Sequence, residues 1–318
     1  MITVLAGGVG AARLLAGLVQ VVDPAELTAV VNTGDDVVLH GLHISPDLDT
    51  ITYTLAGAVN PETGWGLRGE TWQAMGALAR FEAVRPPGSG AAATWFSLGD
   101  QDLATHLYRT HRLREGAPLS TVTAEVTAAW GLEVRLLPMT DDRVETRVEV
   151  AGEGEVGFQE YFVQRRHAVP VTSVRLDGID TAVPAPGVLA AVDDARVVVI
   201  APSNPIVSIG PLLALAPLRA RLEAARDRVV AVSPIVAGRA LKGPADRLMA
   251  ELGHEPSVVG VARIYAPVAS VLVVDTSDAE LAPAVEAEGL RCLVTPTVMH
   301  GPAEAAALGR TVLGAVPA

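Results

Sequence analysis

The sequence opens with MITVLAGGVGAARLLAGLVQVVDPAELTAVVN, residues 1–32. Residues 2–6 are an apolar, β-branched run typical of a buried parallel strand, and residues 14–22 carry an apolar helical pattern. A glycine-rich turn, GGVG, joins the two. A second strand is expected at 27–32, so this stretch predicts a β-α-β unit whose turn directs backbone N–H groups toward a phosphate.

Two acidic turns follow the second expected strand. The first reads NTGDD, residues 32–36, and the second reads SPDLDT, residues 45–50. Their carboxylates suit a hard cation, or a hydroxyl that has to lose a proton. Asp also enters turns for purely local backbone bonding, which is the competing interpretation of either turn alone. A helix is expected over residues 50–56, with Asp49 or Thr50 at its cap.

The remaining pattern predicts an α/β fold, Rossmann-like, with a doubly wound, mainly parallel sheet and a large α+β insertion. One domain, 1–318, is expected, with its core from about 1–60 and 196–318 and the insertion at about 61–195. Expected helices are 71–81, 102–112 with Asp102 as its cap, 120–130, 158–166, 210–225, 245–252 and one after Pro302. Further strands are expected at 134–137, 144–150 at an exposed edge, 169–176, 196–201, 229–233, 258–261, 271–275 and 292–294, with a turn at 152–157.

Composition excludes several classes of protein. Half of the 318 residues are apolar and 19% are charged, as in a globular chain. No uncharged apolar run reaches a membrane span, and the strand at the start is no secretory leader. The single Cys292 precludes an intrachain disulfide, which fits a cytoplasmic protein. A net charge of -12 argues against nucleic-acid binding, although a nucleotide substrate needs only a local site.

The glycine turn does not fit the common nucleotide fingerprints. Counted from Gly8, the third small position of a dinucleotide motif falls on Arg13, and no Gly-Lys-Ser/Thr is present. An NAD-type oxidoreductase, which this turn alone would suggest, is therefore a weak alternative. A tight ligand-free turn would also use glycines.

Several motifs in order along the chain resemble one family. They are GGVGAARL, NTGDD, HGLHISPDLDT, FSLGDQDLATH, LPMTDDRVET, GFQEYFV, PSNPIVSIGP and SPIVAGRALKGPADRLM. Together they are similar to the phospholactate/phosphoenolpyruvate transferases of deazaflavin coenzyme (coenzyme F-420) biosynthesis, the CofD/FbiA family. The resemblance covers nearly the whole chain.

The resemblance implies a magnesium-dependent enzyme with two small-molecule substrates. The donor would be a guanosine diphosphate that carries lactate or enolpyruvate on its distal phosphate. The acceptor would be the terminal ribityl hydroxyl of the deazaflavin Fo, and GMP would be released. A homodimer is the default assembly.

The residues can be fitted to this chemistry. Mg²⁺ would be held by Asp36 and Asp49, with Asp35 and Asp47 as alternates. Asp47 or Asp49 would take the proton of the acceptor hydroxyl. Trp65 and Trp95 are candidates to stack on the flat deazaflavin. Substrate contacts are expected from Gly7, Gly8, Gly10, Asn32, Asp49, Thr50, Asp100, His106, Arg109, Ser203, Asn204 and the only lysine, Lys242.

One departure from the family pattern lies in the FSLGDQD segment. Ser97 and Gln101 stand where many members of the family carry a basic residue, so no charge contact from that loop is expected. The alternative function is a nucleotide- or sugar-nucleotide-binding regulatory protein with the same glycine turn and α/β core. Such a relative would be expected to lack the GFQEYFV and SPDLDT segments.

Overall fold

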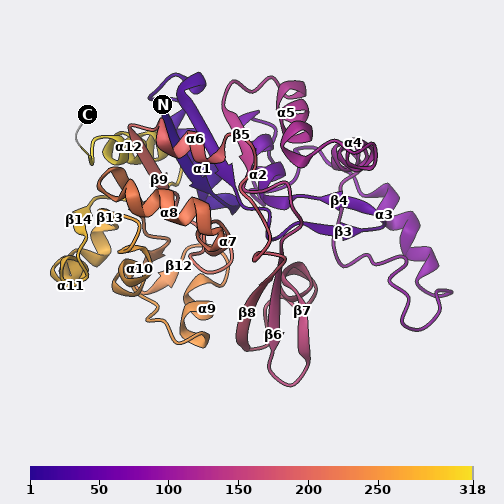
Figure 1. Cartoon of the computed structure of the whole chain (residues 1–318). Coiled ribbons are helices and arrows are strands. Elements are labelled where there is room, and N and C mark those ends of the chain that lie inside the picture. The colour runs from indigo at the N-terminus through magenta and orange to yellow at the C-terminus, as the bar shows by residue number, and fades with distance from the viewer. Residues whose placement is uncertain (317–318) are drawn as a thin grey trace.

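The computed structural model describes residues 1–316 and is built on one seven-stranded parallel sheet (Figure 1). Its strands stand in the order β14-β13-β10-β9-β1-β2-β5. The chain thus leaves β1 toward β2 on one side and returns to β9 on the other, which is a doubly wound arrangement with its switch point between β1 and β9. The strands are β1 (Ile2–Ala6), β2 (Leu27–Val31), β5 (Arg135–Pro138), β9 (Val197–Ile200), β10 (Val229–Val232), β13 (Val271–Val274) and β14 (Arg291–Val294).

Helices cover both faces of this sheet because each strand carries apolar side chains on both sides. Val4 and Val199 face one helical layer, whereas Leu5 and Ile200 face the other. The first layer contains α1 (Gly8–Leu18), α2 (Pro46–Leu55), α5 (Leu119–Ala129) and α12 (Pro302–Leu313). The second contains α6 (Val188–Asp193), α7 (Gly210–Ala214), α8 (Ala216–Ala224), α10 (Val258–Tyr265) and α11 (Ala282–Ala287). The expected α/β, doubly wound fold is confirmed.

A smaller antiparallel sheet is added beside the main one (Figure 1). Its central strand is β6 (Glu145–Val150), flanked by β7 (Gly154–Gly157) and β8 (Val171–Asp177). A π-helical turn, η3 (Glu160–Gln164), follows β7 and closes a separate small core. Residues 61–195, the range expected as an insertion, also contribute strand β5 to the main sheet. Further elements are the hairpins β3 (Val37–Leu39)–β4 (Leu42–Ile44) and β11 (Ile235–Val236)–β12 (Arg239–Ala240), and helix α9 (Ala245–Glu251).

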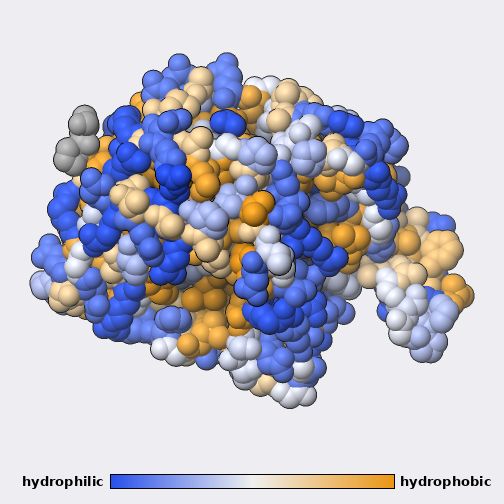
Figure 2. Space-filling view, viewed as in Figure 1, coloured by the Kyte–Doolittle hydropathy of each residue, from blue (hydrophilic) through white to orange (hydrophobic). Residues whose placement is uncertain are grey.

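An arm projects from the body of the molecule between α2 and α4 (Asp102–Arg114). It contains α3 (Gln73–Leu78) and the 3₁₀ turn η2 (Ala79–Phe81), and in Figure 2 it stands apart as a lobe with apolar side chains. Phe81 and Val84 are 59% and 75% exposed, so the arm adds little to the core. Across residues 1–316 no helix combines the length and apolarity needed to cross a bilayer.

One expected strand is a helix. Residues 258–261 are a short apolar run, and such a run has no periodicity that separates a strand from a buried helix. The structure continues it to Tyr265 as α10, because the side chain of Ser257 accepts the N–H groups of Val259 and Gly260 as an N-cap. The expected strand at this position was wrong.

Four local expectations also need correction. The strand β6 lies at the centre of its sheet, not at an edge, because the segment expected as a turn at 152–157 contains its partner β7. The expected helix at 158–166 is only the π-helical turn η3. Helix α2 begins at Pro46, so Asp49 lies inside its first turn instead of capping it. Asp102 is the first residue of α4 and makes no cap bond.

Candidate active site

The glycine turn lies at the carboxyl end of β1, where α1 begins. A Cβ at Gly10 would stand 2.2 Å from the carbonyl oxygen of Pro202, and one at Gly7 would stand 2.9 Å from Asp47 Oδ2. Only glycine therefore allows the turn to pass this close to its neighbours. The hydroxyl of Ser203 donates to Gly7 O at 2.7 Å, which ties the turn to the loop after β9. The three predicted glycines are thus held at the switch point of the sheet.

Asp47 joins the glycine turn to the first acidic turn. The N–H of Gly8 donates to Asp47 Oδ1 at 2.8 Å, and Asn32 Nδ2 donates to Asp47 Oδ2 at 3.0 Å. Asn32 Oδ1 in turn accepts the N–H of Gly34 at 2.9 Å. The sequence placed Asn32 and Asp47 in separate turns, and the structure brings both against the N-terminus of α1.

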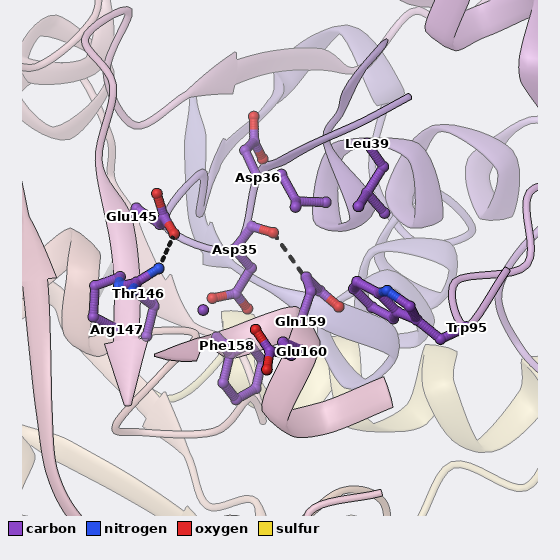
Figure 3. A pocket seen from close by; sticks show the side chains of 13 residues that line it. Asp35, Asp36, Leu39, Trp95, Glu145, Thr146, Arg147, Phe158, Gln159 and Glu160 are labelled. Carbon is purple, nitrogen blue, oxygen red and sulfur yellow. Dashed lines mark hydrogen bonds and ion pairs between the residues drawn. The ribbon is translucent and has the colours of Figure 1, made fainter. Parts of the chain in front are cut away.

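Asp36 is held from β4 and from the start of α2. Ser45 Oγ donates to Asp36 Oδ2 at 2.6 Å, and His43 Nε2 lies 3.0 Å from the same oxygen. Asp35 is held from the segment that follows β7, because Gln159, at the start of η3, donates its Nε2 to the backbone carbonyl oxygen of Asp35 at 3.2 Å. Figure 3 shows Gln159 facing Asp35 across this contact.

Four buried oxygen atoms around this turn have no hydrogen-bond partner among the residues that the structure describes. They are Asp35 Oδ1, Asp36 Oδ1, Thr33 Oγ1 and Thr146 Oγ1. Buried polar atoms are almost always paired, so a group of unpaired oxygens is a place for a ligand. Carboxylate and hydroxyl oxygens are the donors that a hard divalent cation binds. The residues present therefore fit a magnesium ion.

The carboxyl groups of Asp35, Asp36 and Asp47, here called the carboxylate cluster, all have raised pKa values. Burial raises the pKa of Asp35 well above its usual range, and the negative charge of Asp47 adds to this effect. Burial raises the pKa of Asp36 as well, although its contact with His43 opposes the rise. Burial raises the pKa of Asp47 to about 6 against the bonds from Asn32 and Gly8. A bound cation would remove this penalty.

These raised pKa values predict how stability depends on pH without a divalent cation. An acid whose pKa is higher in the folded state stabilises the fold when it is protonated, so its contribution is complete below the unfolded pKa of about 4. That contribution is lost as pH rises through the folded value, about 6 for Asp47. In EDTA we expect the Tm to fall between pH 5 and 7.5, and to fall less in an Asp35→Asn variant. Thermal unfolding at a series of pH values measures this, and a Tm that rises equally in both proteins would contradict it.

A second group of ionisable side chains lies between α2 and α4. Both guanidinium NH groups of Arg109 contact the Asp49 carboxylate, and Arg109 Nη1 lies 3.0 Å from Asp49 Oδ2. His106 stands between two carboxylates, 3.7 Å from Asp49 and 3.2 Å from Asp102. One ligand atom each of Asp49, Asp102 and His106 lie within 4.8 Å of one another, so this group could hold a metal ion. His106 and Arg109 share one face of α4, and that face is buried.

The other predicted contact residues have identifiable neighbours. Lys242 Nζ donates to Thr63 O at 2.9 Å, and partial burial together with the nearby charge of Arg13 lowers the pKa of Lys242. Asn204 Oδ1 accepts N–H groups of its own turn, and Thr50 is buried in α2. The Asp100 carboxylate accepts the Thr71 hydroxyl and the N–H groups at the start of α3, which is a structural role.

A pocket opens beside the carboxylate cluster, between β3, the smaller sheet and the base of the arm. Figure 3 shows Trp95 and Phe158 among its lining side chains, together with Asp35 and Asp36. Trp95, one of the two predicted stacking candidates, therefore lines a pocket next to the carboxylate cluster. Trp65 is 53% exposed and does not line this pocket.

Several residues of this region were missed by sequence reasoning. Gln159 lies in the GFQEYFV segment, but nothing in that segment indicates that its amide reaches a turn more than a hundred residues away. Thr146 comes from β6 and is fully buried beside Gly34, whose Cβ position is 2.9 Å from Thr146 Oγ1. Tyr53 was also missed, although its spacing of four residues from Asp49 places both on one face of α2.

A doubly wound sheet with an oxygen-rich cluster at the carboxyl end of its strands has the arrangement in which open α/β proteins bind their ligands. The family model for 2-phospho-L-lactate transferase CofD matches residues 2–295. A phosphoenolpyruvate transferase of Streptomyces griseus is 45% identical over 316 residues, covering 98% of this chain and 97% of that protein. One of Mycolicibacterium smegmatis is 41% identical over 326 residues, covering 98% and 97%. The chain belongs to the CofD family of transferases.

Solved structures agree with the fold. A crystal structure of a UPF0052 family member from Bacillus halodurans superimposes with a TM-score of 0.60 and covers 98% of both chains. Its sequence identity is 16%, so this likeness concerns the fold alone.

Proposed function

We propose that the enzyme transfers an enolpyruvyl phosphate or phospholactyl group from a guanosine diphosphate donor to the terminal ribityl hydroxyl of the deazaflavin Fo. The observation that carries this proposal is the carboxylate cluster with unpaired oxygens, placed between the glycine turn and the Trp95 pocket. Phosphoryl-type transfer needs such a centre, because charge has to be neutralised while two oxygens are aligned with phosphorus. Relatives named phosphoenolpyruvate transferase favour the enolpyruvyl donor.

The diphosphate of the donor is assigned to the glycine turn. Gly7 and Gly10 leave room for close approach at the start of α1, where backbone N–H groups favour negative charge. Arg13, on α1, and Lys242 lie near each other, and each of them contacts a carbonyl oxygen. Two cations without a carboxylate contact among the described residues are suited to bind phosphate.

Magnesium would be held by the unpaired oxygens of Asp35 and Asp36, with Asp49 directed from α2 by Arg109. When bound, it supplies charge neutralisation at the phosphate oxygens. The protein itself holds these oxygens in fixed positions on a buried turn. Ser45 and His43 fix Asp36, and Gln159 fixes the Asp35 backbone.

The acceptor hydroxyl loses its proton as its oxygen bonds to the distal phosphorus. The bond that breaks joins this phosphorus to the bridging oxygen, which leaves with GMP. Asp47 is assigned as the proton acceptor, because a pKa of about 6 leaves it ionised at neutral pH yet basic enough to take a proton. Asp49 was the other candidate from the sequence, but its oxygens are paired with the positive charge of Arg109, whereas those of Asp47 accept bonds from the uncharged groups of Gly8 and Asn32.

The flat acceptor ring is placed against Trp95. Replacing Trp95 with alanine is expected to raise the KM for Fo by roughly five- to tenfold and to change the KM for the donor little, since an aromatic contact is lost. Steady-state kinetics with each substrate varied in turn measure this. The matched control is Trp72→Ala on the exposed face of the arm, which is expected to be neutral. Equal effects of the two substitutions would contradict the placement.

The reaction is tested by mass spectrometry of products. The protein is incubated with Fo, Mg²⁺ and either the lactyl or the enolpyruvyl donor, with EDTA in parallel. Formation of the phosphoester of Fo with one equivalent of GMP is the expected result, and the productive donor identifies the acid. Nucleotide binding by calorimetry without any product would instead favour the regulatory alternative.

A further inference from the structure

Helices α2 and α4 meet along a seam of six polar side chains. Asp49 and Tyr53 stand one turn apart on α2 and face four residues of α4. The contacts join Asp49 to Arg109 and His106, and Tyr53 to Asp102 and Thr105. The spacing on α4, i, i+3, i+4 and i+7, places all four side chains on one face.

The seam is buried, so water screens its ionic contacts little. Arg109 is 2% exposed, His106 1% and Asp49 5%. A charged side chain removed from water is retained only where it is paired, and a two-pronged guanidinium–carboxylate pair fixes direction as well as charge. The Asp49 carboxylate is therefore held in one orientation by α4, a helix that carries no residue of the carboxylate cluster.

Arg109 also acts electrostatically on the carboxylate cluster. Its charge opposes the burial-induced rise in the pKa of Asp36 on the first acidic turn, while its direct contact is with Asp49 on the second. Arg109 is not among the described residues that line the Trp95 pocket. Arg109 therefore lies outside the pocket assigned to the acceptor ring.

We propose that Arg109 is a positioning residue that fixes the Asp49 carboxylate for the metal, with Tyr53 and Asp102 locking its helix, and that it does not contact substrate. This inference rests on the proposed function and deepens it. It replaces the expectation that Arg109 binds substrate. Replacing a side chain that orients a metal-binding carboxylate commonly lowers metal affinity by about 10- to 100-fold.

Two substitutions separate positioning from charge. Arg109→Lys keeps a cation but loses the two-pronged contact, and Arg109→Gln loses the charge. Loss of a neighbouring cation by itself would strengthen binding of Mg²⁺, whereas loss of orientation would weaken it. We expect both variants to bind Mg²⁺ roughly tenfold more weakly in calorimetry without substrate. Stronger binding by Arg109→Gln would show that Arg109 acts through charge alone and would overturn the proposal.

Kinetics add a second readout. For both variants we expect kcat to fall by roughly tenfold or more while the KM values for donor and acceptor stay within about twofold. A higher KM for either substrate with an unchanged kcat would make Arg109 a substrate contact. A lower Tm with normal kcat and normal Mg²⁺ affinity would reduce it to a structural residue.

Controls keep the test decisive. Tyr53→Phe removes only the hydroxyl that reaches Asp102, keeps the ring against Trp130, and is expected to give the same changes in smaller size. Arg112→Gln, on the outer side of α4, breaks exposed contacts with Glu115 and Glu125 and is expected to leave Mg²⁺ affinity and kcat unchanged. If the native protein forms no product, the proposed function fails, while the Mg²⁺ titrations still decide the role of Arg109.

Discussion

Replacing Asp36 with asparagine is expected to reduce transfer by on the order of a thousandfold, the largest effect of any single substitution in the carboxylate cluster. An amide keeps the shape and can still accept from Ser45, but it supplies no charge for a divalent cation. The same change is expected to leave the Tm in EDTA equal or higher, because it removes a buried carboxylate whose pKa is raised by burial. Product formation at saturating substrates and thermal unfolding measure the two effects.

The control for this substitution is Asp193→Asn. Asp193 lies at the surface end of α6, where it pairs with Arg221, and is expected to change neither activity nor Tm appreciably. An Asp36→Asn protein that turns over at the native rate would remove Asp36 from the site. A large loss of Tm in EDTA would instead show that the carboxylate is needed for folding.

Replacing Asp49 with asparagine is expected to lower the free energy of unfolding by about 3–5 kcal/mol and to abolish transfer. The first effect follows because Arg109 would be left charged and buried without its carboxylate. The second follows because an amide is a poor ligand for Mg²⁺. Denaturant unfolding and the product assay measure them separately.

The double variant Asp49→Asn/Arg109→Gln serves as its control. With the cation also removed, much of the lost stability is expected to return, whereas activity is not. Near-normal turnover by a folded Asp49→Asn protein would contradict the assignment of Asp49. Additive losses of stability in the double variant would contradict the pairing seen in the structure.

The β-α-β unit was predictable because its strands are buried on both faces and its turn needs glycine. Residues 2–6 and 27–31 pair in parallel as the apolar runs indicated. The run at 258–261 was not predictable in the same way, since four apolar residues fit a strand or a buried helix. The side chain of Ser257 caps this segment and stabilises it as a helix.

The site was predictable where its residues share a strand end and not where distant segments meet. Asn32 and Asp36 were expected at the carboxyl end of β2, where parallel strands gather their ends at one edge, whereas Asp47 follows the antiparallel strand β4 and reaches this edge from α2. The burial of Arg109 could not be predicted, since its spacing from His106 is the same on a solvated helix face. Thr146 comes from the smaller sheet and Gln159 from the π-helical turn that follows β7, and the packing of both against the Asp35 turn left no local pattern in the sequence.

The most direct test of the account follows one oxygen atom. Fo labelled with ¹⁸O at its terminal ribityl hydroxyl is incubated with the enolpyruvyl donor, Mg²⁺ and protein. The masses of the phosphoester and of GMP are then measured by mass spectrometry. Attack of this hydroxyl on the distal phosphorus predicts that the label stays in the phosphoester and that GMP is unlabelled. Loss of the label from the phosphoester, or its appearance in GMP, would contradict transfer by the acceptor oxygen at the carboxylate cluster.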